Sequence, residues 1–429
     1  MKKHAITALL YTGIFLSSCS ISKRINRPAK EYILNNEAFV SAHTGISIYE
    51  PATGKYWYNY QGEKYFVPAS NTKLASCYAA MKYLGDSLTG VKYDIVNDST
   101  IVVKGTADPT FMHSDYKNQP VYNFLKHFRS IQIVQSSFTD FLGNGWAWND
   151  YKDDYMAQRS SFPVYGNIVK ISWINNHTLF FIPSFFKNHS FIKENLSNGF
   201  EVMKPWDNND FTFQNGRQKS TDIPFTPSEK TIGNLLQDTL HRRVETITDY
   251  SGQTSHIIHS QPTDSVLKPM MHRSDNFFAE QSLLMVSNKL LGVMNDGRII
   301  DTLLKTDFSL MPQKPRWVDG SGLSRYDLFS PKDFVFILNK MKDDFGMDRI
   351  KNILPTGGTG TISRYYRADS GYIFVKTGSL SGVVALSGFL YTKKNKLLIF
   401  SILINNHQSS GITIRKEIEK FLEEVRDKN

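Results

Sequence analysis

Residues 67–81 read VPASNTKLASCYAAM, with a serine and a lysine three positions apart at the start of an apolar run. The small and apolar residues after Lys73 predict a buried helix, and Pro68 marks the break before it. Ser70 is therefore expected at the N-terminus of a helix that runs from about residue 70 to about residue 84. Because residues three positions apart are neighbours on a helix surface, the side chains of Ser70 and Lys73 should share one face.

Two further short strings follow in the chain, Ser274-Asp275-Asn276 and Lys376-Thr377-Gly378. The Ser-x-x-Lys spacing alone is weak evidence, because it also occurs elsewhere, for example at Ser20 and Ser265. A chance Ser-Asp-Asn or Lys-Thr-Gly is expected about 0.1 times in a chain of this length, so the ordered set of three is far rarer than its parts. The set resembles that of penicillin-binding proteins and class A β-lactamases, in which the serine is a nucleophile.

Further strings resemble the low-molecular-mass penicillin-binding proteins of the D-alanyl-D-alanine carboxypeptidase/endopeptidase type, peptidase family S13. These strings are residues 67–70, 105–110, 145–150, 163–167, 319–325 and 357–361. The similarity covers roughly residues 40–405. It implies an α+β fold: a penicillin-binding-protein/β-lactamase-like transpeptidase domain, built from an antiparallel five-stranded sheet with helices on both sides, and a mostly β inserted module.

The two ends of the chain are expected to share that sheet. Residues 44–61 predict a β-hairpin, and residues 372–377, 383–390 and 397–403 predict three strands. If Ser70 is to meet Lys376, these strands must belong together. The segments expected to form further helices are residues 229–242, 273–291, 331–345, where Ser330-Pro331 provides an N-cap and an N1 proline, and 412–427.

The first two motifs are separated by roughly 200 residues, which is too long for a connection within a single domain. Residues 95–255 are rich in β-branched and aromatic residues, turns and Asn/Asp clusters, so they are expected to form the inserted, mostly β module. Residues 30–94 and 256–429 would then form the serine DD-peptidase domain. At 429 residues, 41% of them hydrophobic, the chain can bury the cores of two or three domains.

The first 19 residues resemble a bacterial lipoprotein signal: Lys2 and Lys3, a short apolar run, and Leu16-Ser17-Ser18-Cys19. This resemblance implies cleavage before Cys19 and a diacylglyceryl group on its thiol. An ordinary secretory signal with an incidental cysteine is the alternative. The run is too short to span a bilayer as a mature helix. We therefore expect an exported protein on the periplasmic side, anchored to the membrane only by its N-terminal lipid.

The formal net charge is +10, which suits anionic headgroups or an acidic polymer such as cell wall, although a solvated surface with excess lysine explains it equally well. Export disfavours nucleic acid as a partner. Lipidation of Cys19 would leave Cys77 as the only free thiol, in the helix after Ser70, so no disulfide framework is expected.

The chemistry expected at Ser70 follows from its need for a base, because an unassisted serine hydroxyl is a weak nucleophile. Lys73 can take the proton when neutral, which requires its pKa to fall from about 10.4 to near 7. Burial, the positive charge of Lys376 and the helix N-terminus all favour that fall. The family resemblance further implies that Ser274 relays the proton to the leaving amine and that Asn276 hydrogen-bonds the substrate amide and Lys73.

The resemblance also implies roles in substrate binding. Lys376 and Thr377 would bind the terminal carboxylate of the substrate or of a β-lactam, and Gly378 lets the strand approach it. The backbone N–H groups of Ser70 and Ser379 would form the oxyanion hole. Asp150 aligns with a family aspartate that binds an ammonium group of the stem peptide; a turn residue beside two packed tryptophans is the alternative interpretation.

No cofactor and no metal are expected. His256 and His259 have a spacing compatible with metal binding but lack an HExxH motif or a cysteine partner, so strand or loop histidines are favoured. Residues 357–360 contain three glycines but lack the Lys-Ser/Thr of a phosphate-binding loop, and a tight turn is favoured.

The function expected from these residues is a serine D-alanyl-D-alanine carboxypeptidase or endopeptidase that cleaves peptidoglycan stem peptides through an acyl-enzyme on Ser70 and binds β-lactams covalently. Two alternatives remain. One is a β-lactamase of the same fold, which would need a deacylating glutamate of the kind found in class A enzymes, and the sequence assigns none. The other is a non-catalytic lipoprotein that binds cell wall. The sequence does not address the oligomeric state.

Overall fold

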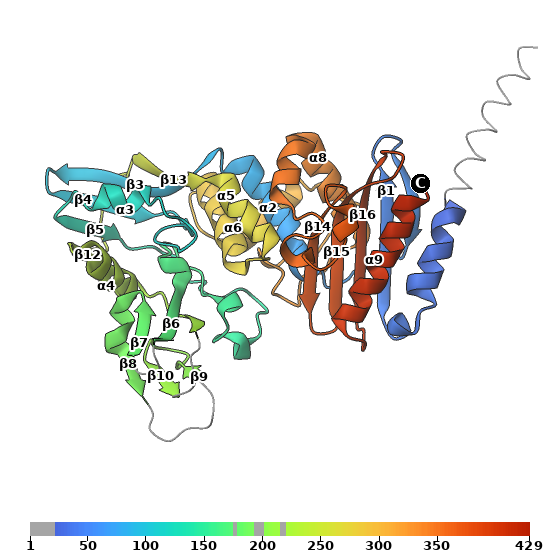
Figure 1. Ribbon diagram of the computed structural model, residues 1–429. Helices are drawn as coiled ribbons and strands as arrows, with labels where there is room; N and C mark the ends of the chain where they lie inside the picture. Colours follow the sequence, from blue (N-terminus) through green and yellow to red (C-terminus); the bar gives the residue numbers. More distant parts are fainter. Residues whose placement is uncertain (1–21, 175–177, 193–200, 215–219) are drawn as a thin grey trace, which may run out of the picture.

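The structure is a computed structural model that describes residues 22–174, 178–192, 201–214 and 220–429. The two ends of the chain build one body with helices and a large sheet, and the middle of the chain builds a second, strand-rich body beside it (Figure 1). The lipoprotein-signal prediction for residues 1–19, including Cys19, falls outside the described residues.

The central sheet of the first body has five antiparallel strands in the order β14-β15-β16-β1-β2. The strands are β1 (His43–Glu50), β2 (Lys55–Tyr60), β14 (Ile373–Leu380), β15 (Val383–Tyr391) and β16 (Leu397–Asn405). β1 pairs with β16 from His43 opposite Asn405 to Tyr49 opposite Ile399. The expected sharing of one sheet by the two ends of the chain is confirmed.

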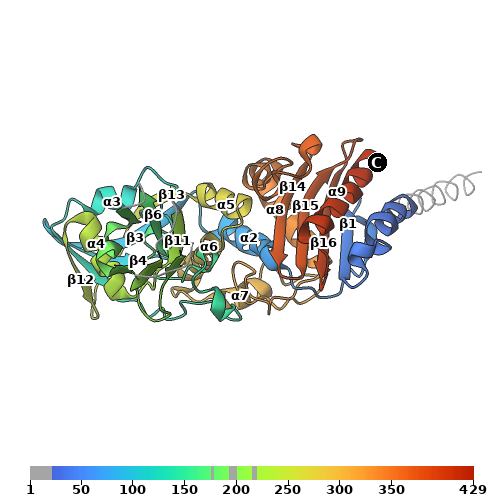
Figure 2. The same ribbon diagram turned by 60° about the horizontal axis from the view of Figure 1, so that its bottom comes forward.

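Both faces of this sheet are covered, as the apolar character of its strands requires. Side chains alternate along a strand, so Ile399 and Leu403 of β16 join one core and Phe400 and Ile402 join the other. The first core is shared with α2 (Lys73–Tyr83) and α8 (Pro331–Ile353), and the second with α9 (Gly411–Asp427). Figure 2 shows α9 and α8 on opposite sides of the sheet.

The helices near the motifs follow the predictions with three differences. The helix expected to begin at about residue 70 begins only at Lys73 (α2), and Ser70 lies in the short helical turn Ala69–Thr72 before it. Ser330 caps α8 and Pro331 is its first residue, as expected. The predicted helix 273–291 begins only at Asn276 (α6, Asn276–Leu291), because Asp275 caps it and accepts a hydrogen bond from the Phe278 N–H group. The helices α5 (Thr263–His272) and α7 (Asp296–Lys305) were not predicted.

The second body contains a five-stranded sheet in the order β12-β5-β4-β3-β13 and two three-stranded sheets, β11-β6-β7 and β8-β10-β9. Its larger elements are β3 (Ser87–Asn97), β4 (Thr100–Gly105), α3 (Pro120–Leu125), β5 (Ser130–Val134), β6 (Ile168–Ile174), β7 (Thr178–Ile182), β8 (Ser190–Ile192), β9 (Glu201–Met203), β10 (Phe211–Gln214), β11 (Ser220–Pro224), α4 (Glu229–Leu240), β12 (Arg243–Ile247) and β13 (His256–Pro262).

The sheet of the insertion extends beyond the expected boundaries at residues 95 and 255. β3 begins at Ser87, directly after α2, and β13 ends at Pro262, directly before α5. These two strands pair with each other, antiparallel, with His256 opposite Tyr93 and Pro262 opposite Ser87. The chain therefore enters the insertion through β3 and leaves it through β13 at neighbouring positions. Because the two ends of the insertion are close together, its length does not force α2 and α5 apart.

Short helical turns complete the described chain: η1 (Lys30–Leu34), η2 (Glu37–Phe39), η3 (Ala69–Thr72), η4 (Trp148–Asp150), η5 (Asp154–Met156), η6 (Tyr165–Asn167), η7 (Ser184–His189), η8 (Gly360–Ile362) and η9 (Arg367–Asp369). Among the helices of the described residues, none has both the length and the apolar character needed to cross a membrane.

Candidate active site

The three sequence motifs meet where α2, α6 and the edge strand β14 come together. Ser70 lies in the turn η3 immediately before α2, and η3 lies beside β14. Ser274 directly precedes the cap of α6, in a left-handed conformation with φ of 64°. Lys376 lies on β14. Strand pairing and helix packing thus bring together groups that are hundreds of positions apart.

Lys73 is fully buried, and its amine lies within hydrogen-bond distance of three oxygen atoms. Its Nζ is 2.9 Å from Ser70 Oγ, 2.6 Å from Asn276 Oδ1 and 2.7 Å from the carbonyl oxygen of Ser321. The amine is therefore held in place beside the serine hydroxyl, at a distance suited to proton transfer.

Lys376 is likewise fully buried and connects the second and third motifs. Its Nζ lies 2.8 Å from Ser274 Oγ and 2.8 Å from the carbonyl oxygen of Thr377. The five residues predicted to be catalytic, Ser70, Lys73, Ser274, Asn276 and Lys376, are thus joined in two hydrogen-bonded groups at one site.

The burial of both lysines changes their ionisation. Burial lowers the pKa of Lys73 to about 8, and the negative charges of Asp319 and Glu280 oppose this shift. Burial also holds the pKa of Lys376 well below its usual value, and the positive charge of Lys73 lowers it further. Because two buried cations repel each other, a proton on one amine lowers the affinity of the other amine for a proton. A neutral amine is therefore accessible, as a general base requires.

Ser70 opens onto a cleft of about 550 Å³ that both bodies line. The peptidase body contributes Ser70, Ser274, Asn276, Gly322, Leu323, Arg325, Ser379, Leu380 and Ser381, and the insertion contributes Gly145, Ala147, Asn149, Asp150 and Tyr155. The site is thus a concave surface between the two bodies, lined by polar and apolar groups alike, and its size suits a short peptide.

Gly378 brings the backbone of β14 against the turn that carries Ser70. A Cβ atom on Gly378 would lie 2.6 Å from the carbonyl oxygen of Pro68 and 3.1 Å from the Ser70 nitrogen. The Ser70 N–H group therefore lies against the strand, next to Ser379. This is the arrangement that an oxyanion hole made from these two N–H groups needs.

Asn276 is oriented from the insertion. Its Nδ2 donates a hydrogen bond to the carbonyl oxygen of Tyr155 at 2.8 Å. A carbonyl can only accept, so this contact fixes the amide with its Oδ1 toward Lys73. The sequence carried no indication of this role for the Tyr155 backbone.

Comparison with known proteins agrees with this geometry. The model of the D-Ala-D-Ala carboxypeptidase 3 (S13) family matches residues 29–183 and 217–425, most of the chain. The chain belongs to the S13 family. This confirms the resemblance that the motifs indicated.

Individual S13 relatives are distant in sequence but close in fold. Carboxypeptidase DacB of Mycolicibacterium smegmatis is 28% identical over 173 residues, which cover 38% of this chain and 38% of that relative. The aligned part is therefore well under two thirds of the relative's length.

The crystal structure of penicillin binding protein 4 (dacB) from Haemophilus influenzae superposes with a TM-score of 0.74 at 20% identity, covering 92% of this chain and 97% of that one. A second crystal structure of that protein, complexed with a novel β-lactam, gives a TM-score of 0.69 at 19% identity, covering 90% of this chain and 96% of that one. The α+β transpeptidase fold is thereby confirmed.

Asp150, the S13 aspartate carried over from the resemblance, lies at the end of η4 and lines the cleft of Ser70. Among the described residues that line this cleft, it is the only carboxylate. The alternative interpretation placed it beside two packed tryptophans, but Trp148 is 74% exposed. Because no glutamate lines the cleft, the described residues also lack a counterpart of the deacylating glutamate that a class A β-lactamase would use there.

The residues after Lys376 have partners that the sequence did not predict. Thr377 Oγ1 donates to Thr361 Oγ1 at 2.8 Å, which ties β14 to the glycine-containing segment 357–361. Arg415 of α9 donates from Nη2 to Ser379 Oγ at 2.5 Å. These two contacts hold β14, the edge strand beside Ser70, to the segment 357–361 and to α9.

Three features that the sequence analysis judged not to be metal-binding, phosphate-binding or disulfide-forming sites can now be placed in the structure. His256 and His259 lie on β13, and the described residues contain no group of three or more potential metal ligands. Gly358 and Gly360 have φ angles of 80° and 51°, as expected for tight turns. Cys77 is buried in α2, where burial raises the pKa of its thiol to about 12.

Proposed function

We propose that this chain is a serine D-alanyl-D-alanine carboxypeptidase, with endopeptidase activity toward the same type of bond, that acts on peptidoglycan stem peptides. The observation that carries the proposal is the pair of contacts Lys73 Nζ to Ser70 Oγ at 2.9 Å and Lys376 Nζ to Ser274 Oγ at 2.8 Å, with both serines lining one cleft. Membership of the S13 family supports the same activity.

In the acylation step, Ser70 Oγ attacks the carbonyl carbon of the penultimate D-alanine while its proton passes to neutral Lys73. When Ser274 later protonates the leaving amine, this proton replaces the one that Ser274 gives up, so Lys73 and Ser274 both return to their starting states. The carbonyl oxygen becomes an oxyanion between the N–H groups of Ser70 and Ser379. Each such donor is worth about 10²- to 10³-fold in rate, and the base about 10²- to 10⁴-fold. Gly378 allows this approach because it has no side chain.

The tetrahedral intermediate then loses its amine. Ser274, hydrogen-bonded to Lys376, is the donor placed to protonate the leaving nitrogen, and Thr377 with Lys376 holds the terminal carboxylate. An ester on Ser70 remains, which water hydrolyses to regenerate the hydroxyl. A β-lactam would follow the same path, but its amine stays tethered to the acyl group after ring opening, so the ester would persist.

Intact-mass measurement after incubation with excess penicillin G tests the proposal. The wild-type protein should gain the mass of one penicilloyl group, and Ser70→Ala should gain none. An unmodified wild-type protein would contradict the proposal. Rapid turnover of nitrocefin without a lasting adduct would instead indicate the β-lactamase alternative.

Digestion of purified muropeptides identifies the bond that is cleaved. Release of free D-alanine from pentapeptides reports carboxypeptidase activity, and conversion of cross-linked dimers to monomers reports endopeptidase activity. The Ser70→Ala variant is the matched control. Equal digestion by both proteins would favour the non-catalytic alternative.

We also propose that the mature protein begins at a lipidated Cys19 and faces the periplasm. This rests on Lys2, Lys3, the short apolar run and the Leu-Ser-Ser-Cys string. A peptidoglycan substrate requires an exported enzyme, so the proposed location and the proposed activity are consistent.

A further inference from the structure

Behind Lys73 lies a loop whose shape depends on one buried carboxylate. The carbonyl oxygen of Ser321, which accepts from Lys73 Nζ at 2.7 Å, belongs to the loop 319–324. Asp319 Oδ1 accepts from the Gly322 N–H group at 2.6 Å, and Oδ2 accepts from the Ser324 N–H group at 2.7 Å. Asp319, Ser321 and Ser324 are all fully buried. The Asp319 carboxylate therefore fixes the backbone that presents the Ser321 carbonyl to Lys73.

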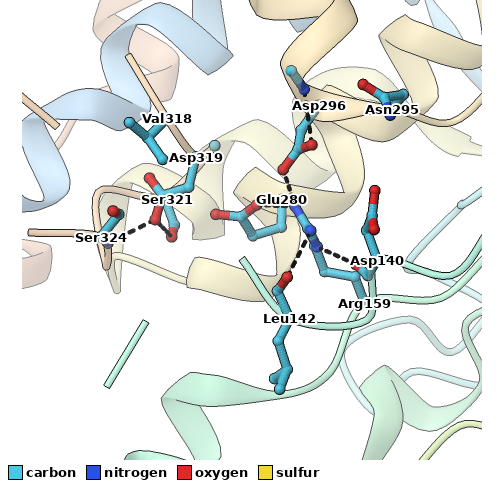
Figure 3. A network of polar contacts seen from close by, with 12 residues as sticks. Asp140, Leu142, Arg159, Glu280, Asn295, Asp296, Val318, Asp319, Ser321 and Ser324 are labelled. Atoms are coloured by element: carbon cyan, nitrogen blue, oxygen red, sulfur yellow. Dashed lines mark hydrogen bonds and ion pairs between the residues drawn. The ribbon is translucent and has the colours of Figure 1, made fainter. Parts of the chain in front are cut away.

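A second carboxylate, Glu280, lies next to this loop on α6, one helical turn after Asn276. Figure 3 shows Glu280 between Asp319 on one side and Arg159 on the other. Arg159 is 1% exposed and donates from Nη1 to Glu280 Oε2 at 3.2 Å and to Asp296. The Ser321 hydroxyl lies 3.5 Å from Asp319 Oδ2. Burial and the negative charge of Asp319 raise the pKa of Glu280 to about 7, and the pairing of Glu280 with Arg159 opposes that rise.

Residues of the insertion donate hydrogen bonds to both carboxylates. Trp146 Nε1 donates to Asp319 Oδ2 at 2.9 Å, and Arg159 donates from Nε and Nη2 to carbonyl oxygens of its own segment, at Asp140 and Leu142. The same segment, residues 140–159, carries Asp150 and the Tyr155 carbonyl. The part of the insertion that lines the cleft is thus anchored to the groups behind Lys73.

We propose that Asp319 is a positioning residue for acylation and that Glu280 sets the charge next to it: Asp319, held by Trp146, acts through the Ser321 carbonyl to keep Lys73 beside Ser70, and Glu280, held by Arg159, adds a negative charge behind Lys73. The inference rests on the proposed function, because it concerns the same acylation step. Neither carboxylate lines the cleft, so neither touches the substrate.

The charges around Lys73 affect its pKa, which a purely structural role of Asp319 or Glu280 would not change. The pKa of Lys73 is therefore a suitable quantity to measure. Burial lowers the pKa of Lys73, and four carboxylates oppose this shift: Asp319, Glu280 of α6, Asp275 at the cap of α6, and Asp327. Two positive charges lie nearby. One is Lys376, whose pKa is lowered by burial and by the charge of Lys73, and the other is Arg159, which pairs with Glu280. Removing a negative charge at Asp319 or Glu280 should therefore lower the pKa of Lys73, so that neutral Lys73 is available at lower pH.

The experiment measures the second-order rate of acylation by a fluorescent penicillin from pH 6 to pH 9.5 for the wild type, D319N and E280Q. D319N replaces one of the two carboxylate oxygens by an NH₂ donor, so at least one of the three N–H groups that Asp319 accepts from loses its acceptor. Lys73 should then be misplaced, and the plateau rate should fall by about 10²-fold. E280Q leaves the loop contacts intact, so its plateau should stay within a few-fold of wild type while its midpoint moves to lower pH. D301N, at an exposed carboxylate of α7, is the matched control and should change neither.

Folded D319N and E280Q proteins with the plateau and midpoint of wild type would overturn the inference. If D319N does not fold, as judged by circular dichroism and thermal unfolding, the midpoint of E280Q decides alone. A wild-type protein that penicillin does not acylate contradicts the proposed function, whereas normal wild-type acylation with unchanged variants contradicts only this inference.

Discussion

Lys73 acts as a base only when its amine is neutral, and burial brings this form within reach by lowering its pKa to about 8. The neutral fraction rises as pH increases through that pKa. Acylation of Ser70 should therefore increase about tenfold per pH unit below pH 8 and level off above it. Stopped-flow acylation by penicillin between pH 6 and pH 9.5 measures this profile.

Lys73→Arg is the control for this prediction. A guanidinium remains protonated over the whole range, so the variant should lose about 10²- to 10⁴-fold in acylation rate at every pH. A wild-type rate that did not change between pH 6 and pH 8 would show that Lys73 is not the group whose neutral form limits the reaction.

Asp150 is the residue through which the insertion can affect substrate choice, because no other carboxylate lines the cleft in the described part of the chain. Asp150→Asn should reduce kcat/KM by about tenfold for stem peptides that carry a free side-chain ammonium group, since a charge-assisted hydrogen bond is lost. Acylation by penicillin, which lacks that ammonium, should be unchanged. Both rates are measured on the purified protein.

Asp153→Asn, at an acidic residue three positions away that does not line the cleft, should leave both substrates unaffected. An equal loss for peptide and penicillin in Asp150→Asn would indicate general damage to the cleft instead of ammonium binding.

At the scale of elements, the reaction depends on how closely strand β14 approaches the turn η3. Gly378→Ala places a methyl group 2.6 Å from the Pro68 carbonyl oxygen, a distance that real Cβ contacts do not show, so strand and turn must separate. The expected result is a loss of acylation of at least about 10²-fold, since one oxyanion donor is displaced. The measurement is the rate of penicilloyl formation.

Gly297→Ala on α7 is the matched control, because its nearest atom would be the Asn295 side-chain oxygen at 3.6 Å, an ordinary contact. This variant should acylate at the wild-type rate. Wild-type acylation by Gly378→Ala as well would show that the approach of β14 to Ser70 is not needed for reaction.

Elements could be predicted where their cause is local. The hairpin, the three C-terminal strands and the last helix agree with the expected ranges, because alternation and helical spacing are read within ten or twenty residues. The helices α5 and α7 were missed, and α5 even contains Pro269 in its interior, which argues against a helix in sequence. Packing against α2, α6 and α8 stabilises α5 in spite of that proline.

At the scale of the whole molecule, the proposed lipid on Cys19 determines where the enzyme works. Cys19→Ser should move the protein from the membrane fraction to the soluble fraction of the cell envelope, because the thiol that carries the lipid is gone. Fractionation followed by immunoblotting measures this. The activity of the purified variant should equal that of the wild type, since Ser70 and its partners are untouched.

Cys77→Ser is the control for this fractionation, and it should remain with the membrane. A Cys19→Ser protein that stays in the membrane fraction would contradict the lipid anchor and favour an ordinary secretory signal.

The sequence by itself determined which groups we propose to react and how the ends of the chain are built. Ser70, Lys73, Ser274, Asn276 and Lys376 could be named because short motifs and hydrophobic periodicity are local properties. The three-dimensional arrangement confirmed that they meet.

Only the tertiary structure decided what surrounds the reacting groups. Arg159 and Glu280 are 121 positions apart, and no local pattern connects them. Their pairing, the Asp319 contacts and the Tyr155 carbonyl on Asn276 arise when the insertion folds back over α6. Burial is a property of the whole fold. It lowers the pKa of Lys73, and it strengthens the interaction of Lys73 with the carboxylates around it, because little water screens these charges.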